Sequence, residues 1–252
     1  MIKNSIENSL NQEPYYKIIS NFKRNKSLKK TFLNFAENLG NILPQNKENK
    51  KILEIKPNLK KISQLKKKKT KIKSVLRYHQ TNLGGSIHSD GPQLSSPPKY
   101  IIMACEKNSL KGGETILVNT LKIYNFLKIK KPEILKILKK DFYFERRGFN
   151  FSNKNVFSKP IFFKSEKKFI FRYLRDYIEK GYQIKKSTIS KKQLQAFNYL
   201  DKLLSDEKFY KKTKLNRGDL VVLNNHILAH GRTAFKIKSK KNVRKLYRIW
   251  IN

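Results

Sequence analysis

The sequence has a single cysteine, few acidic residues and no long apolar segment. Because Cys105 is the only cysteine, a disulfide bond within the chain is excluded. No run of 18 apolar residues is present, which argues against a transmembrane helix. The opening residues, 1–12, are polar and lack the apolar core of a signal peptide. Together these features predict a soluble protein of the cytoplasm.

Acidic residues are scarce relative to basic ones. Lys and Arg total 58 against 18 Asp and Glu, a formal net charge of +40. Nucleic-acid binding is one interpretation, because Lys and Arg neutralise phosphates. The other is compositional bias, since Lys, Ile and Asn are abundant along the whole chain, as an AT-rich genome would produce. Most lysines are spread out rather than gathered in one motif, so we prefer the compositional interpretation and keep nucleic acid as an alternative partner.

A length of 252 residues suffices for one large domain with a substantial core. We predict a helical N-terminal segment, 1–39, followed by a single domain, 40–252, with Gly40 as the helix stop. The segment 56–73 holds nine lysines and no acid, including the run Lys66–Lys69. Such a charge run predicts a solvated loop, and it is the best candidate for a basic arm.

Short apolar segments bounded by turn residues predict strands, and two longer periodic segments predict helices. The predicted strands cover 52–55, 100–104, 114–118, 142–144, 160–163, 169–171, 220–223 and 247–251. The predicted helices cover 120–138, divided by Pro132, and 190–206. Many short strands with a few helices indicate a mostly β protein, a barrel or sandwich with helices outside.

The segment His88-Ser-Asp90 places an imidazole and a carboxylate two positions apart. On an extended strand both side chains point to one face. Two His and one carboxylate form the facial triad of non-heme Fe(II) oxygenases, which leaves coordination positions open. The third ligand must come from elsewhere, and a His-X-Asp alone can equally be a polar strand end.

The chain has four histidines, so the candidates for a third ligand are few: His79, His226 and His230. His226 and His230 lie four apart, so a helical pair that binds zinc is an alternative. The preceding residues, 218–225, are typical of a strand and a loop, which argues against that helix.

Four blocks of this sequence resemble the taurine dioxygenase-like (TauD/TfdA) family of Fe(II)/2-oxoglutarate-dependent oxygenases. They are His88–Asp90, Gly112–Thr115, Gly218–Phe235 and Arg244–Arg248, in the order of the family. The third block is the most specific, and the resemblance runs from about residue 40 to the C-terminus. It implies that His88, Asp90 and His230 ligate iron.

The resemblance also implies a cosubstrate site. Arg248 would bind the distal carboxylate of 2-oxoglutarate, helped by the hydroxyl of Thr115, and Arg244 on the same strand face is a second candidate. An Arg guanidinium is suited to this because it meets a carboxylate in bidentate fashion. Arg248 taken alone could be an ordinary surface charge on a strand.

The implied fold is mostly β with flanking helices: a double-stranded β-helix, or jelly roll, of the clavaminate synthase-like type. The implied reaction is that of an oxidoreductase. It uses Fe(II), O2 and 2-oxoglutarate to hydroxylate a small molecule, with release of succinate and CO2. A nucleic-acid-associated or protein-modifying oxygenase, recruited by the basic surface, is the alternative, and a non-enzymatic binding protein on a degenerate oxygenase fold is the third hypothesis.

Residues that bind the primary substrate are harder to predict. In 171–175, aromatic and Arg side chains alternate, so this segment could line a pocket or be an exposed strand edge. Polar residues that flank the His-X-Asp segment are candidates of similar weight. The substrate candidates are therefore Arg172, Tyr173, Arg175, Asn82 and Gln93. Nothing in the sequence predicts the substrate's identity or the oligomeric state.

Overall fold

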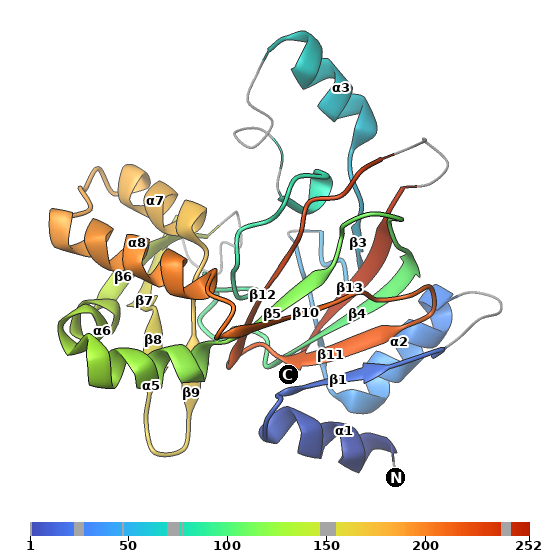
Figure 1. Cartoon of the computed structure of the whole chain (residues 1–252), viewed down its shortest axis with the longest axis horizontal. Coiled ribbons are helices and arrows are strands. Elements are labelled where there is room, and N and C mark those ends of the chain that lie inside the picture. The colour runs from blue at the N-terminus through green and yellow to red at the C-terminus, as the bar shows by residue number, and fades with distance from the viewer. Residues whose placement is uncertain are drawn as a thin grey trace.

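Two antiparallel sheets face one another, and helices cover the outer side of each sheet (Figure 1). The computed structural model describes residues 2–22, 28–46, 48–69, 76, 78–146, 155–237 and 243–252. Layers of this kind arise because each sheet has two apolar faces to bury. The predicted architecture of short strands with helices outside is confirmed for these residues, and the sheets do not close into a barrel.

The major sheet has six strands in the order β1-β11-β4-β13-β2, and β3 also pairs with β13. Its strands are β1 (Tyr16–Ile19), β2 (Ile42–Leu43), β3 (Leu53–Ile55), β4 (Tyr100–Lys107), β11 (Leu220–Asn224) and β13 (Lys245–Ile251). Strands β4, β11 and β13 form its centre. They are almost continuously apolar because both of their faces are covered.

The minor sheet has three strands in the order β10-β5-β12. They are β5 (Thr115–Asn119), β10 (Tyr210–Thr213) and β12 (Leu228–Arg232). Alternate side chains of the two sheets fill the space between them. This inner layer includes Met103, Cys105, Leu117, Val221, Leu223, Leu228, Leu246 and Trp250.

Helices α1 (Ile2–Asn11) and α2 (Leu28–Leu39) cover the outer face of the major sheet (Figure 1). Residues 1–39 were predicted to be helical, which is wrong for Tyr16–Ile19. This segment is strand β1, which pairs with β11 at the edge of the major sheet. Backbone groups at a sheet edge need partners, and that demand outweighs local helical preference. The N-terminal segment is thus part of the sheet rather than an appendage.

The outer face of the minor sheet is covered by what we call the helical cap. It comprises α5 (Thr120–Lys130), α6 (Pro132–Leu138), α7 (Arg175–Ile184) and α8 (Lys191–Leu204), with the hairpins β6 (Asp141–Glu145)–β7 (Val156–Pro160) and β8 (Phe162–Lys164)–β9 (Phe169–Phe171). Pro132 begins α6, as predicted, and a capping box formed by Ser190 and Gln193 begins α8. Helix α7 was not predicted, and the strand predicted for 160–163 is divided at Ile161 between β7 and β8.

The lysine-rich segment is only partly a loop. Helix α3 (Leu59–Lys67) occupies its centre, so the predicted loop is wrong there. Asn58 caps the first turn, and Ile62 and Leu65 are buried on one face. These two apolar residues stand three positions apart among lysines and supply an amphipathic face that the number of charges concealed. Residues 70–73 of the segment lie outside the described residues. No helix of the described chain is long and apolar enough to span a membrane.

Candidate metal centre

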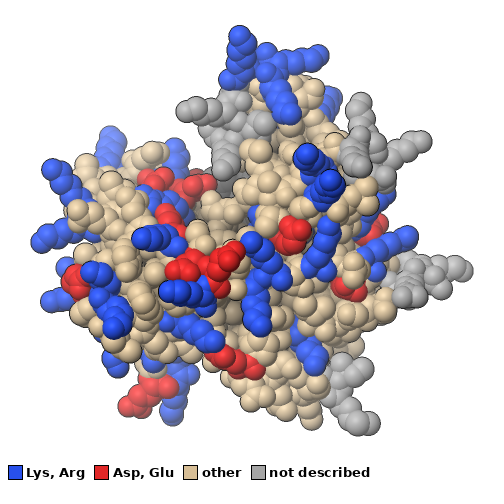
Figure 2. Space-filling view, in the orientation of Figure 1, with Lys and Arg blue, Asp and Glu red and all other residues tan. Residues whose placement is uncertain are grey.

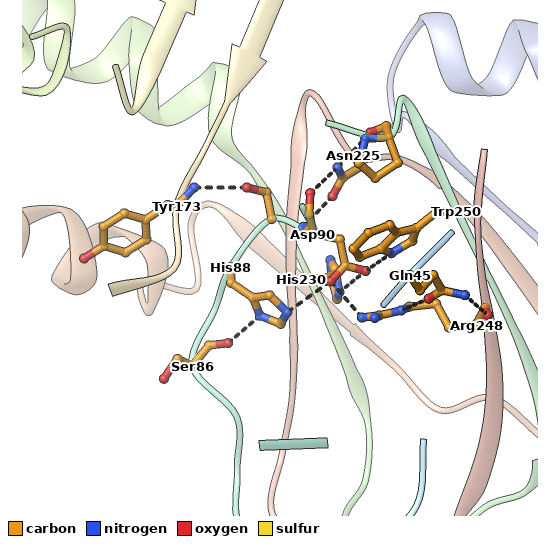
Figure 3. Close-up of polar contacts among 11 residues, drawn as sticks. Gln45, Ser86, His88, Asp90, Tyr173, Asn225, His230, Arg248 and Trp250 are labelled. Atoms are coloured by element: carbon orange, nitrogen blue, oxygen red, sulfur yellow. Dashed lines mark hydrogen bonds and ion pairs between the residues drawn. The ribbon is translucent and has the colours of Figure 1, made fainter. Parts of the chain in front are cut away.

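Three buried side chains, His88, Asp90 and His230, converge between the sheets (Figure 3). Their ligand atoms all lie within 4.8 Å of one another. Nε2 of His88 lies 3.6 Å from Oδ1 of Asp90, and Nε2 of His230 lies 3.8 Å from Oδ2. Both distances are too long for hydrogen bonds. The imidazoles therefore face the carboxylate across a gap that a cation could bridge.

The two histidines are brought together by their own backbones. His88 and His230 form an isolated β-bridge, in which each N–H donates to the other's carbonyl, at 3.0 and 2.7 Å. Their rings stand 4.5 Å apart, centroid to centroid. His230 lies on β12, and the segment containing His88 adds to the edge of the minor sheet. Residues that are 142 positions apart thus become cross-strand neighbours on one face.

The carboxylate of Asp90 is held by two residues of β13. Arg248 Nη1 donates to Oδ1 at 2.7 Å, and Trp250 Nε1 donates to Oδ2 at 2.9 Å. The other side of Arg248 is occupied by Gln45, whose Oε1 accepts from Nε at 2.9 Å. Burial by itself raises the pKa of Asp90, but Arg248 and the imidazoles of His88 and His230 outweigh it and hold that pKa well below its usual range. Asp90 is therefore a carboxylate at neutral pH.

Both imidazoles can present a nitrogen lone pair to a metal. Burial, with the nearby charge of His88, lowers the pKa of His230 to about 3, so this residue is neutral at pH 7. Nδ1 of His88 lies 2.9 Å from the carbonyl of Ser86, which leaves Nε2 facing Asp90. Nδ1 of His230 is buried and has no hydrogen-bond partner among the described residues. Two buried imidazoles and one buried carboxylate form a donor set that fits Fe(II).

Several arginines are buried in this protein, and one of them, Arg248, contacts the triad. Among the described residues, the buried charged side chains other than the histidines are four arginines and two aspartates: Arg172, Arg232, Arg244, Arg248, Asp90 and Asp219. Arg232 pairs with Thr115 across β12 and β5, a neighbour that sequence reasoning missed. An interior with more positive than negative side chains is costly unless anions bind there.

Arg244 lies beside the Gly-Gly turn that precedes Thr115. Its Nε donates to Oδ1 of Asn108 at 3.2 Å, and its Cδ would lie only 3.2 Å from a Cβ on Gly113. Gly112 and Gly113 both have positive φ, 73° and 78°, and a Cβ on Gly112 would overlap the carbonyl of Ala234. Only glycine lets this turn approach the chain so closely.

A comparison with family models matches residues 24–250 to "Taurine catabolism dioxygenase TauD, TfdA family". The chain belongs to this family. FR-33289 synthase of Streptomyces rubellomurinus (strain ATCC 31215) is 25% identical over 185 residues, which are 70% of this chain and 52% of that protein. The chain therefore spans about half the length of the curated relative it matches.

Solved structures of similar fold include iron-containing oxygenases. An asparagine oxygenase in complex with Fe(II), 2S,3S-3-hydroxyasparagine and succinate has a TM-score of 0.73 at 11% identity, covering 99% of this chain and 78% of that one. The oxygenase OrfP, in complex with Fe and alpha-ketoglutaric acid, has a TM-score of 0.67 at 13% identity, covering 100% and 79%. PvcB from Pseudomonas aeruginosa has a TM-score of 0.67 at 16% identity, covering 99% and 80%. The predicted double-stranded β-helix is thereby confirmed.

The zinc alternative does not hold within this family member. His230 lies on a strand, not a helix, and His226 lies in the turn before β12. Nε2 of His226 lies 3.1 Å from the carbonyl of Pro97, and burial lowers its pKa to about 4. Among the described residues, the three that could jointly hold a metal are the predicted triad.

Two of the predicted substrate residues bind the helical cap instead. The hydroxyl of Tyr173 donates to Asp201 at 2.6 Å, and Arg175 donates to the other oxygen of Asp201 at 2.7 Å and to Glu179 at 2.8 Å. Figure 3 shows the ring of Tyr173 turned away from the triad. The alternation predicted for 171–175 ends at Arg175, because this residue begins α7. Both side chains therefore join the triad region to α8.

The other substrate candidates are Arg172, Gln93 and Asn82, and each makes different contacts. Arg172 is buried and donates to the carbonyls of Leu94 and Ser95, at 2.9 and 3.0 Å, and burial lowers its pKa to about 10. Gln93 is only 3% exposed, and its Oε1 has no hydrogen-bond partner among the described residues. The amide of Asn82 donates to the carbonyl of Phe235. Gln93 is thus the one candidate here with an unused buried acceptor.

Sequence reasoning missed two residues that bind Asp90, Trp250 and Asn225, and a third, Gln45, that binds its partner Arg248. Trp250 lies within a predicted strand and Asn225 within the third family block, but neither position shows its contacts in the sequence. Gln45 lies in an irregular segment with no motif. A signal existed only for Asn225, a polar residue in an otherwise apolar strand-and-turn segment.

Proposed function

We propose that this protein is an Fe(II)- and 2-oxoglutarate-dependent dioxygenase that hydroxylates a small molecule. The observation that carries the proposal is the buried constellation of His88, Asp90 and His230, which leaves one face of a bound metal to other ligands. Membership in the TauD/TfdA family supports the same reaction. The structurally similar asparagine oxygenase and OrfP, whose complexes contain iron with succinate or alpha-ketoglutaric acid, support the choice of cosubstrate.

With iron bound, the site would couple two oxidations by one O2: 2-oxoglutarate becomes succinate and CO2, and a C–H bond of the substrate becomes C–OH. The chain's own part is to bind, orient and exclude water. His88, Asp90 and His230 would hold the metal on one side. The apolar inner layer around Leu117 and Leu246 keeps the opposite side dry.

A dianionic cosubstrate matches the charge of the interior. Among the described residues, the four arginines Arg172, Arg232, Arg244 and Arg248 are buried together with two aspartates, Asp90 and Asp219. An interior rich in arginine would suit the two carboxylates of 2-oxoglutarate. Buried cations favour binding of anions strongly, because little water screens them.

For the distal carboxylate we propose Arg244 with Thr115, in place of the sequence-based preference for Arg248. Arg248 donates to the carboxylate of an iron ligand, so its guanidinium is already committed beside the metal. Arg244 lies next to Gly113, two residues before Thr115. By strand alternation Thr115 faces the inner layer together with Leu117.

The proposed substrate is a small polar molecule. The similar solved structures contain hydroxyasparagine and hydroxyarginine, which supports an amino-acid-like size. Gln93 adds a buried amide with an unused acceptor three residues after Asp90, which would suit an N–H group of the substrate. Arg172 would supply positive charge in the same segment. The cytoplasmic location stays a prediction.

The test is succinate formation from 2-oxoglutarate by purified protein with Fe(II) and O2, across a panel of amino acids and other small polar molecules. We expect a slow basal rate that at least one substrate class stimulates. Asp90→Ala, which lacks the carboxylate ligand, is the matched control and should form no succinate. Equal succinate formation by wild type and Asp90→Ala would contradict the proposal.

The second candidate is an oxygenase that acts on a nucleic acid. One observation favours it: α3 carries four lysines and no acid, beside a groove of about 860 Å³ lined by Lys56, Lys107, Arg217 and Lys245. Two acids, Glu54 and Glu106, lie in the same groove and pair with its lysines. Figure 2 shows Lys and Arg spread over the whole visible face rather than gathered there, which fits compositional bias better.

Neutralising Lys66–Lys69 separates the two candidates. For a small-molecule oxygenase, the four-fold Lys→Gln variant should keep wild-type succinate formation, because these side chains are exposed and distant in sequence from the triad. For a nucleic-acid oxygenase, the variant should lose binding to a single-stranded oligonucleotide. The salt dependence of that binding should also become shallower by up to about four ions.

A further inference from the structure

The backbone of Asp90 is held by a side chain and not by a strand. His88, two residues earlier, pairs with His230 through two backbone hydrogen bonds. At Asp90 the partner is the amide of Asn225, which lies in the turn between β11 and β12 (Figure 3). Its Oδ1 accepts from the N–H of Asp90 at 2.8 Å, and its Nδ2 donates to the carbonyl of Asp90 at 3.0 Å. One carboxamide thus imitates the pair of bonds that a neighbouring strand residue would make.

The same amide closes the loop that follows Asp90. Nδ2 of Asn225 also donates to the carbonyl of Pro98 at 2.8 Å, and its backbone N–H donates to the carbonyl of Lys99 at 2.8 Å. Asn225 is fully buried, and both of its amide hydrogens and its oxygen are used. A buried amide with every group bonded has one orientation only, so it fixes both ends of the segment 90–98.

We propose that Asn225 is a positioning residue of the metal centre: its amide sets the backbone of Asp90 so that the carboxylate meets the two imidazoles on one face. Arg248 and Trp250 orient the carboxylate itself, but they bind only the side chain. The backbone has no other bonded partner at this residue in the hydrogen bonds of the described chain. If the backbone of a metal ligand shifts, its side chain moves out of the coordination sphere, even when other residues bind that side chain.

The inference rests on the proposed metal ligands, and its test uses metal affinity in addition to activity. Co(II) binding under anaerobic conditions, followed by calorimetry and by the visible spectrum of the bound ion, is compared for wild type, Asn225→Ala and Asn225→Asp. Asn225→Asp keeps the shape and the acceptor but sets a carboxylate oxygen against the carbonyls of Asp90 and Pro98. We expect both variants to bind Co(II) about 10- to 100-fold more weakly, with an altered spectrum.

Asn224→Ala is the matched control. Asn224 is the preceding residue and also buried, but its amide donates to the carbonyl of Leu10 and accepts from the N–H of His226, with no bond to Asp90. We expect a lower melting temperature in this variant, with the Co(II) affinity and spectrum of the wild type. If Asn225→Ala does not fold, Asn225→Ser, whose hydroxyl can still reach one carbonyl, takes its place.

Two results have separate meanings. Wild-type Co(II) affinity and spectrum in folded Asn225→Ala or Asn225→Ser, together with loss of binding in Asp90→Ala, would overturn the positioning role and leave the metal centre intact. Wild-type Co(II) binding in Asp90→Ala would instead overturn the proposed metal ligands. A purely structural role of Asn225 predicts the first result, because stability would then fall without any change at the metal.

Discussion

Two networks in this protein each join an aspartate to an arginine and to an aromatic hydrogen-bond donor, but in different surroundings. At the metal centre, Asp90 accepts from Arg248 at 2.7 Å and from the indole of Trp250 at 2.9 Å. In the helical cap, Asp201 accepts from Arg175 at 2.7 Å and from the hydroxyl of Tyr173 at 2.6 Å. The side chains of Asp90 and Arg248 are 6% and 7% exposed, whereas those of Asp201 and Arg175 are 43% and 19% exposed.

The two ion pairs have similar distances, but their different exposure gives them different roles. Water screens the pair in the cap, so its ions stabilise little, on the order of 0 to 1 kcal/mol. In the centre little water is available, so removing one partner leaves a buried charge uncompensated, at a cost of about 3 to 5 kcal/mol. A buried carboxylate with a lowered pKa is also ready to bind a cation at neutral pH. Distance alone does not distinguish a structural network from a functional one.

The largest expected effect comes from the ligands themselves. Asp90→Ala, His88→Ala and His230→Ala should each abolish detectable Fe(II) binding, since the chain supplies three ligands and cannot replace one. Anaerobic calorimetric titration measures this. Asp201→Ala removes the corresponding carboxylate of the cap and should bind Fe(II) normally. If both aspartates behaved alike, the two networks would have no functional distinction.

The next effect distinguishes Arg248, which lies within β13, from Arg244, which lies just before that strand. Arg248→Met leaves Asp90 without its cation, so the metal-free protein should lose about 3 to 5 kcal/mol of unfolding free energy. Added Co(II) should restore much of that loss, because the metal then compensates the carboxylate. Arg244→Met should keep its stability but raise the apparent KM for 2-oxoglutarate strongly. Denaturation with and without Co(II), and succinate kinetics, check the pair. A raised KM only in Arg248→Met would return the cosubstrate anchor to that residue.

A smaller effect is expected from His226, a half-buried group outside both networks. Its pKa is about 4 in the folded protein, below the ordinary value of 6.5. Between these two pH values His226 is therefore protonated in the unfolded chain and neutral in the folded chain. Stability from this residue is therefore fully present above about pH 6.5 and is lost as the pH falls toward 4, by up to about 1.4 kcal/mol per pH unit. His226→Gln should lose less stability over that interval, as measured by urea unfolding at several pH values. Parallel curves would show that His226 is not buried in solution.

The smallest effect should come from the cap network. Arg175→Ala removes a partly exposed ion pair and should cost roughly 1 kcal/mol or less of unfolding free energy. It should not change Fe(II) affinity or the KM for 2-oxoglutarate. A loss of substrate-stimulated turnover in Arg175→Ala, with these two quantities unchanged, would restore its predicted role in substrate binding.

The strands and the proposed metal ligands were predicted from different features of the sequence. Apolar strands such as Leu220–Asn224 are evident because burial on both faces demands continuous apolar residues. The strand Tyr16–Ile19 and the helix Arg175–Ile184 were missed because their local patterns are mixed, and tertiary partners decided them. The lysines of 56–73 hid the apolar face of α3, because net composition outweighed spacing in the prediction.

The residue types and spacing of the sequence determined the candidate ligands: a His-X-Asp pair, a distant His and the arginines after it are chemically suited to hold iron and an anion. Only the tertiary structure decided which other residues contact these ligands. The contacts of Asp90 with Asn225 and Trp250 join segments up to 160 residues apart. The pairing of Arg248 with Asp90, rather than with a cosubstrate, is likewise set by how β13 faces the minor sheet. Such contacts depend on how the two sheets pack against each other, which the local sequence around each residue does not indicate.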